Sequence, residues 1–215
     1  MRYIVLDTET TGLDPDDGHK IIEIGCIEIL NRNITSNTFH KYLNPNREID
    51  LEASKIHGLT NSFLKDKPEF QEIYLELREY ISNSPIIIHN APFDIGFLKK
   101  EHSTTTASDD FIDNEIIDSL KLARKISPGK KNTLDALCER YSIDNSDRTL
   151  HGALLDAKLL AFVYLKMTIG QNNFSDLTSG HNVNGYTNTV IDDDFKIIEP
   201  SDEDKKLHLN YFNES

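Results

Sequence analysis

Two carboxylates near the N-terminus have a spacing that suits the binding of a divalent cation. Asp7 and Glu9 lie two residues apart at the end of a strand-like run, in VLDTETTG. Because a strand has a two-residue period, both side chains point to the same face. Two carboxylates that meet there repel each other unless a cation lies between them, and Mg²⁺ or Mn²⁺ is the expected cation. For this pair alone, a solvated strand end explains the sequence equally well.

Three further polar residues stand at the edges of predicted helices. Asp94 follows a short apolar run in HNAPFDIGF and starts a helix that Asn90 is expected to cap. Taken alone, Asp94 is more simply a first-turn acid that complements the helix dipole. His151 and Asp156 stand in LHGALLDAKLLA. Five residues on a helix correspond to about 500°, so the two side chains would point roughly 140° apart if both residues were helical. They can face one site only if His151 lies in the loop before the helix that carries Asp156. Alone, His151 would more often be a surface or capping histidine.

Together, the four carboxylates and the histidine suit phosphodiester hydrolysis assisted by two divalent cations. Such carboxylates hold two cations about 3.5–4 Å apart, of which one prepares a hydroxide and the other stabilises the leaving 3′ oxygen. A histidine, whose ordinary pKa is near neutrality, accepts the proton of the attacking water. No serine or cysteine stands in a GxSxG-like context, and no P-loop or GxGxxG motif is present, so ATPase-type chemistry has no support.

The elements that must position these residues describe an α/β domain. Strand-like runs occupy residues 2–6, 20–30, 34–43 and 86–88, with a hairpin turn at 31–33. Helical segments are predicted at residues 52–56, 69–81, 92–98, 133–141 and 153–167. Three strands followed by alternating helices and strands predict a layered α/β domain over residues 1–170.

The composition changes after Gly170. Residues 171–194 are rich in Asn, Gly, Ser and Thr without periodicity, which is typical of a flexible linker. Apolar residues return at 195–198, and Ser201 precedes a predicted helix over 202–211. A short structured segment behind a linker needs a partner on which to bury its apolar side chains. We therefore expect residues 195–215 to bind another protein, and a frayed tail without function is the alternative.

Charge and composition exclude several classes of protein. The 215 residues carry 36 Asp and Glu against 23 Lys and Arg, a net charge of −13. This acidity argues against a general nucleic-acid binder but not against a metal nuclease, because bound cations reverse the local charge. No apolar run is long enough to cross a membrane, no signal-peptide pattern is present, and Cys26 and Cys138 belong to no metal or disulfide motif. We expect a cytoplasmic protein.

Three segments in this order, IVLDTETTGL, HNAPFDIGFL and HGALLDA, resemble the three exonuclease motifs of the DEDD superfamily in its histidine-bearing (DEDDh) branch. Longer blocks, GHKIIEIGCIEI, IHGLT and PGKKNTLDALCERYSIDNSDRTLHGALLDA, are similar to the epsilon proofreading subunits of bacterial DNA polymerase III. The resemblance extends from Tyr3 to about Gly170. It implies a ribonuclease H-like fold, a mixed β-sheet flanked by α-helices, and stepwise removal of nucleotides from DNA 3′ ends.

The resemblance also implies the roles of individual residues. Two divalent cations, Mg²⁺ or Mn²⁺, would be held by four carboxylates: Asp7, Glu9, Asp94 and Asp156. His151 would be the general base. The family's contacts to the terminal nucleotide correspond to Asp7, Thr8, Glu9, Glu52, His57 and Asp156. The family commonly has alanine where this chain has Pro92, and because a first helical turn tolerates proline, we expect no loss of activity.

Partners follow from the same resemblance. In the family, a linker leads to a C-terminal segment that binds the polymerase alpha (catalytic) subunit, which here would be residues 195–215. Gln171, Phe174 and Leu177 loosely resemble a sliding-clamp-binding pentapeptide. The sequence leaves open whether a small theta-like subunit also binds. Because mismatched DNA ends fray at lower cost than matched ends, selectivity for errors can arise largely from the DNA.

Two alternatives to a proofreading DNA exonuclease stay open at this point. An RNA-trimming exonuclease of the same superfamily would use the same chemistry and differ in how it reads the 2′-hydroxyl. A non-catalytic subunit that keeps the fold and stabilises a polymerase is the other alternative, and the presence of all five site residues argues against it.

Overall fold

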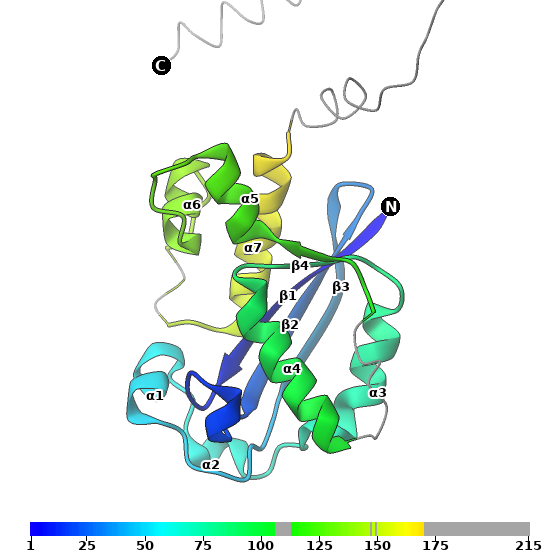
Figure 1. Cartoon of the computed structure of the whole chain (residues 1–215), viewed down its shortest axis with the longest axis vertical. Coiled ribbons are helices and arrows are strands. Elements are labelled where there is room, and N and C mark those ends of the chain that lie inside the picture. Colours follow the sequence, from blue (N-terminus) through cyan, green and yellow to red (C-terminus); the bar gives the residue numbers. More distant parts are fainter. Residues whose placement is uncertain (106–112, 147, 149, 170–215) are drawn as a thin grey trace, which may run out of the picture. The chain divides into compact units, whose positions relative to one another are not determined.

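The computed structural model describes residues 1–105, 113–146, 148 and 150–169. They form a mixed β-sheet with helices on both faces (Figure 1). The predicted linker, the predicted partner-binding segment and the clamp-like pattern beginning at Gln171 all lie outside the described residues. No helix in the described ranges is long and apolar enough to span a membrane.

The sheet has five strands in the order β3-β2-β1-β4-β5. The antiparallel part consists of β1 (Arg2–Thr10), β2 (Ile21–Leu30) and β3 (Asn33–Tyr42). Two short strands, β4 (Ile86–Ile88) and β5 (Ile116–Asp118), continue the sheet parallel to β1. The predicted mixed sheet is thereby confirmed. Because β1 and β4 are parallel, their carboxyl ends meet at one edge, which brings Asp7 and Glu9 near the segment that follows β4.

The helices match most of the predicted segments. Their bounds are α1 (Leu51–His57), α2 (Asn61–Leu64), α3 (Phe70–Ile81), α4 (Ala91–Thr105), α5 (Ser119–Ile126), α6 (Leu134–Arg140) and α7 (Ala153–Met167), with a 3₁₀ turn η1 (Pro15–Asp17). The sequence predicted α1, α3, α6 and α7, and it placed the end of α4 too early. It missed η1, α2 and β5, which have only three or four residues and cannot show a clear apolar period. It also missed the eight-residue α5, whose apolar residues do recur at helical spacing.

The two faces of the sheet bury different cores. Alternate residues of β1, such as Ile4 and Leu6, face α3 and α4 together with the fully buried Phe97. The intervening Val5 faces α7, where it packs with Ala157 and Leu160. This alternation is what the two-residue period of a strand requires when helices cover both faces. Cys26 and Cys138 are both buried and unbonded to each other.

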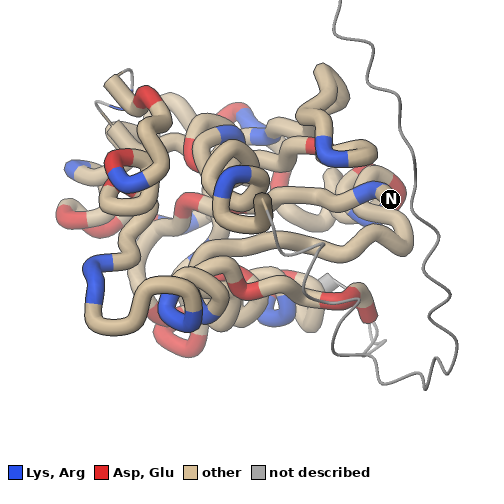
Figure 2. Tube along the Cα trace, turned by 90° about the horizontal axis from the view of Figure 1, so that it is seen from above, with Lys and Arg blue, Asp and Glu red and all other residues tan. Residues whose placement is uncertain are grey.

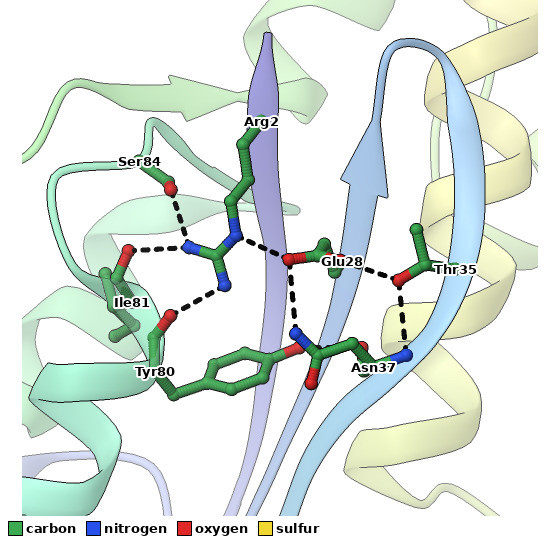
Figure 3. A network of polar contacts seen from close by, with 7 residues as sticks. All are labelled: Arg2, Glu28, Thr35, Asn37, Tyr80, Ile81 and Ser84. Carbon is green, nitrogen blue, oxygen red and sulfur yellow. Dashed lines mark hydrogen bonds and ion pairs between the residues drawn. The ribbon is translucent and has the colours of Figure 1, made fainter.

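A polar network fixes the start of β1 to its neighbours (Figure 3). The Arg2 guanidinium pairs with Glu28 of β2 at 2.5 Å and donates to the Tyr80 carbonyl at the end of α3 at 2.8 Å and to the Ser84 hydroxyl at 2.7 Å. The hydrogen bond from Arg2 lowers the pKa of Glu28, so that this carboxylate stays ionised. Glu28 also accepts hydrogen bonds from two residues of β3, Thr35 and Asn37. Strand β1 is therefore held in register at the end opposite to Asp7 and Glu9.

One glycine allows α7 to approach the sheet closely. Gly25 of β2 pairs with Asp7 across the ladder. A Cβ atom at residue 25 would lie 2.3 Å from the Ala153 carbonyl carbon and the Leu154 nitrogen, which are backbone atoms that cannot move aside alone. Gly25 therefore sets how near the first turn of α7, which carries Asp156, lies to β1.

Replacing Gly25 with alanine is accordingly expected to shift α7 away from the sheet. We expect the free energy of unfolding to fall by about 1–3 kcal/mol, the usual cost of overpacking. Nuclease activity should fall further than stability explains, because Asp156 moves with the helix. Denaturant unfolding and a nuclease assay on the same sample measure both effects. Gly96→Ala is the control for replacing a glycine, because this helical residue has no left-handed φ, does not line the cleft, and its added Cβ would approach only the Pro15 side chain, at 3.9 Å. Activity proportional to the folded fraction in Gly25→Ala would contradict this account.

Candidate active site

The four carboxylates singled out in the sequence line a single cleft. Asp7 and Glu9 lie near the end of β1, Asp94 lies in the first turn of α4, and Asp156 lies in the first turn of α7. The cleft has a volume of about 1130 Å³ and is also lined by Thr8 and His151. Elements far apart in the sequence thus bring the predicted metal and catalytic residues together.

Strand β1 positions the buried Asp94 directly. The carboxylate of Asp94 accepts hydrogen bonds from the Thr8 hydroxyl at 2.7 Å and from the Thr8 backbone N–H at 3.1 Å. On the same helix, the rings of Phe93 and Phe97, four residues apart, pack with their centroids 5.0 Å apart. The expectation that Asn90 caps α4 was wrong. Its φ of 70° is left-handed, whereas a capping residue has extended backbone.

His151 lies in the loop immediately before α7, as the angle to Asp156 requires. Its backbone N–H donates to the Ile56 carbonyl of α1 at 3.1 Å, which attaches the loop to that helix. Its side chain is 45% exposed, and Nδ1 lies 3.4 Å from an Asp156 carboxylate oxygen. Gly152 between them has an extended backbone, with φ of −155°, which any residue can adopt, so the bend into α7 does not require a glycine.

Burial and mutual repulsion make the carboxylate cluster electrostatically unfavourable by itself. Burial raises the pKa of Glu9 to about 8, and the charges of Asp156, Glu23 and Asp94 add to the effect. Burial also raises the pKa of Asp94 to about 7, although the hydrogen bonds from Thr8 oppose this rise. The pKa of Asp7 is raised well above its ordinary value by burial, then by Asp94, Asp156 and Glu9. The cluster therefore favours protons or cations.

A divalent cation fits this cluster. Ligand atoms of Glu9, His151 and Asp156 all lie within 4.8 Å of one another, a span that one ion can bridge. Carboxylate oxygens are the ligands that Mg²⁺ and Mn²⁺ prefer. The raised pKa values of Asp7, Glu9 and Asp94 show that the buried carboxylates lack enough positive charge nearby to stabilise their ionised forms, and a bound cation would supply that charge.

The stability of the metal-free protein should fall as the pH rises. A carboxyl whose pKa is higher in the folded chain than in the unfolded chain binds its proton more tightly when folded. The bound proton therefore stabilises the fold at low pH, and this stabilisation is lost as the pH rises from the unfolded pKa to the folded pKa. For Glu9 this window runs from pH 4.5 to about 8. Asp7 and Asp94 shift in the same direction, so we expect a total loss on the order of 5 kcal/mol over this range in EDTA. Thermal unfolding against pH measures it.

Two measurements, one in Mg²⁺ and one on the Glu9→Gln variant, test whether the carboxylate cluster causes this pH dependence. Saturating Mg²⁺ should flatten the profile, because the cations replace the protons. Glu9→Gln removes one of the titrating groups and should reduce the slope in EDTA. An equally steep profile in Mg²⁺ and in Glu9→Gln would show that other groups cause it.

An arginine that the sequence prediction missed lies inside the cluster. The Arg148 side chain is 6% exposed and grips both oxygens of Asp156, at 2.6 and 2.7 Å, in a bidentate pair. It also pairs with Asp135 at 2.5 Å and contacts His151 Nδ1 at 3.0 Å. Because a guanidinium can donate but not accept hydrogen bonds, the Nδ1 atom of His151 acts as the acceptor. The only indication in the sequence that Arg148 belongs to the site is its position three residues before His151.

Two predicted substrate contacts lie apart from the cleft lining. Glu52 is exposed on α1 and pairs with Lys55. His57, at the end of α1, is buried, its Nδ1 accepts from the Leu59 N–H at 3.0 Å, and burial lowers its pKa. Neither residue lines the cleft. Helix α1 is nevertheless attached to the His151 loop through the Ile56 carbonyl, so it flanks the site.

Comparison with known proteins gives consistent matches. The exonuclease family model of the RNase T type matches residues 4–164. DNA polymerase III subunit epsilon of Buchnera aphidicola is 50% identical over 98% of this chain and 95% of that protein. The subunit of that name from Escherichia coli K12 is 52% identical over 83% of this chain and 76% of that protein.

Solved structures agree with the fold. Exonuclease X in complex with 5′ overhanging duplex DNA is 26% identical, with a TM-score of 0.65 over 79% of this chain and 93% of that chain. E. coli Exonuclease I in complex with a dA16 oligonucleotide is 15% identical, with a TM-score of 0.70 over 82% of this chain and 42% of that chain. The predicted ribonuclease H-like fold is confirmed.

Proposed function

This chain belongs to the exonuclease family and, within it, to the epsilon subunits of DNA polymerase III, and from this premise we propose how its cleft performs 3′→5′ proofreading. The activity is the hydrolysis of phosphodiester bonds in DNA. The observation that carries the proposal is the convergence in one cleft of four carboxylates from β1, α4 and α7 and a histidine from the loop before α7. No other group of His, Cys, Asp and Glu in the described ranges has a comparable metal-binding geometry.

We propose that the carboxylates of Asp7, Glu9, Asp94 and Asp156 hold two divalent cations, Mg²⁺ or Mn²⁺. When bound, the cations activate the attacking water and neutralise charge on the scissile phosphate and on the leaving 3′ oxygen. The raised pKa values in the cluster support this assignment, since burial and like charges both disfavour ionised carboxylates without a cation.

The chain's own residues orient the substrate and accept the proton. The Thr8 side chain and backbone fix the carboxylate of Asp94, so this ligand keeps one orientation. His151 is the general base and is exposed enough to reach a water molecule. In the present arrangement its Nδ1 lone pair faces Arg148, so Nδ1 can accept the water proton once that contact is broken.

The substrate and partners follow from the family. We propose that the 3′-terminal nucleotide lies along Asp7, Thr8 and Glu9, with Glu52 and His57 of α1 approaching it from the flank. Residues 195–215, behind a linker over 171–194, would bind the polymerase alpha subunit, which places the protein in the cytoplasm beside the replicating DNA. Gln171, Phe174 and Leu177 would contact the sliding clamp. A small theta-like subunit would bind the domain over residues 1–170.

A primer degradation assay tests the proposed function. The full chain is incubated with labelled primer–templates that end in a matched or a mismatched pair, and with an RNA oligonucleotide of equal length, in Mg²⁺, Mn²⁺ or EDTA. Stepwise release of 5′-mononucleotides from DNA, faster at the mismatch and absent in EDTA, is the expected result. A preference for RNA would assign the chain to RNA trimming, and cleavage of neither would overturn the proposed function.

A further inference from the structure

The cleft that contains the carboxylates also has a basic wall. Residues 119–133 contain five Lys and Arg and no Asp or Glu, in a chain whose net charge is −13. Three of these five, Arg124 of α5 and Lys130 and Lys131 of the loop between α5 and α6, line the cleft. Outside this segment, both basic and acidic residues are spread over the described part of the chain (Figure 2). We call Arg124, Lys130 and Lys131 the basic wall.

The loop that carries the basic wall has a defined conformation. The amide nitrogen of Asn132, a residue that is 8% exposed, donates to the Lys130 carbonyl at 2.9 Å, and its oxygen accepts from Arg140 at 2.8 Å. The same arginine donates to the Lys131 carbonyl at 2.5 Å. Gly129 has a left-handed φ of 74°, which turns the chain immediately before the two lysines. The backbones of both lysines are thereby fixed.

The loop is also connected to the edge of the sheet that carries the active site. His89 directly follows β4 and precedes α4, the helix of Asp94. Its Nε2 lies 2.9 Å from the Asn132 carbonyl, and its Nδ1 lies 2.9 Å from the Ser119 hydroxyl of α5. Both partners are uncharged and burial lowers the pKa of His89, so the loop is held here by hydrogen bonds alone. The basic wall and Asp94 are therefore held on one scaffold.

The cations of the basic wall are available to a ligand. All three side chains belong to exposed residues, and no carboxylate of the described residues forms an ion pair with any of them. The two nearby acids have other partners: Asp118 pairs with Lys121 at 3.8 Å, and Asp135 pairs with Arg148 at 2.5 Å. Three unneutralised cations beside a cluster of carboxylates indicate a ligand that carries negative charge along its length.

We propose that Arg124, Lys130 and Lys131 bind backbone phosphates of the DNA strand being degraded, on the 5′ side of the reacting phosphate. This inference rests on the proposed function. The cleft volume of about 1130 Å³ exceeds the roughly 300–1,000 Å³ typical of small-molecule pockets, so it has room beyond one reacting nucleotide. Lysine and arginine contacts to phosphates hold a strand without reading its bases, which suits an enzyme that removes any nucleotide. The basic wall thus gives this acidic protein a local positive surface that can bind the DNA backbone.

Two substrates of different length test this proposal. One is a single-stranded DNA 12-mer, and the other is the p-nitrophenyl ester of thymidine 5′-monophosphate, which has no upstream phosphate. The full chain and its Lys130→Ala/Lys131→Ala variant are assayed on both over a series of KCl concentrations. Lys158→Ala/Lys166→Ala, which removes two exposed lysines of α7 that do not line the cleft, is the charge-matched control.

The expected result is a selective loss on the long substrate. The kcat/KM of Lys130→Ala/Lys131→Ala on the 12-mer should fall about tenfold at low salt. The slope of its logarithm against log[KCl] should become shallower by about 1.4, or 0.7 for each lost phosphate contact on a single strand. Turnover of the ester should stay within about twofold, and the control should resemble the wild type on both substrates.

Other outcomes overturn the proposal in distinguishable ways. An unchanged salt slope on the 12-mer, with activity retained, would show that the basic wall does not bind DNA. An equal loss on the ester and on the 12-mer would indicate a structural role for the loop. Weaker binding to a polymerase partner with an unchanged salt slope would assign the basic wall to a protein surface instead. Failure of the wild type on both substrates would overturn the proposed function itself.

Discussion

Replacing Asp7 with asparagine is expected to abolish exonuclease activity and, in EDTA, to raise thermal stability. Asn keeps the shape of the side chain but removes one of four converging negative charges, and repulsion from Asp94, Asp156 and Glu9 contributes to the raised pKa of Asp7. Loss of a cation ligand should cost at least about 4 kcal/mol of transition-state stabilisation, or roughly 10³-fold in rate. Primer degradation in Mg²⁺ and thermal unfolding in EDTA measure the two effects.

The prediction is specific because activity should fall while thermal stability in EDTA should rise. A residue that merely supports the fold would lose activity and stability together. Asp66→Asn, which removes an exposed charge outside the cleft, serves as the matched control and should change neither quantity. An Asp7→Asn protein with wild-type activity, or one that is strongly destabilised in EDTA, would contradict the role of Asp7 in a repulsive metal-binding cluster.

Truncation of Arg148 to alanine is expected to destabilise the metal-free protein strongly. The guanidinium is the bidentate partner of Asp156, and the two side chains are 6% and 5% exposed. Removing one member of a buried ion pair leaves the other charge uncompensated, which typically costs about 3–5 kcal/mol. Saturating Mg²⁺ should restore most of this loss, because the cations then neutralise Asp156 in place of the arginine. Denaturant unfolding in EDTA and in Mg²⁺ gives the difference.

Two further variants separate charge from geometry at this position. Arg148→Lys keeps the positive charge without the planar fork, so it should recover part of the stability in EDTA. Arg124→Ala removes an exposed arginine that has no ion pair in the described ranges and should leave stability unchanged. Equal stability of wild type and Arg148→Ala in EDTA would contradict the assignment of Arg148 as the counter-ion of Asp156.

Much of the site could be predicted because its residues follow regular periods. The two-residue period of β1 puts Asp7 and Glu9 on one face, and the helical angle requires His151 to precede α7. The long segments α3, which is amphipathic, and α7, which is apolar on most sides, have enough apolar residues at helical spacing to determine both their type and their bounds. Short elements such as α2 and β5 lack such repeats, and tertiary packing determines them instead.

The features that escaped prediction depend on contacts between distant segments. An arginine in a loop has no period, and the pair of Arg148 with Asp156 and Asp135 exists because α6 and α7 lie together. The basic wall is similar, since Lys130 and Lys131 face the cleft through the hydrogen bonds of Asn132, Arg140 and His89. Asn90 was misassigned because asparagine suits both a helix cap and a left-handed turn.

Calorimetric titration of Mn²⁺ into the metal-free full chain tests the central claim most directly. We predict saturable binding of more than one cation for each chain in the wild type, together with proton release at pH 7 from the carboxyls whose pKa values are raised. Asp7→Asn and Asp156→Asn should each lose the tighter binding. Stoichiometric binding that survives in both variants, or a wild type that binds no Mn²⁺ while still degrading DNA, would contradict a catalytic centre built on these carboxylates.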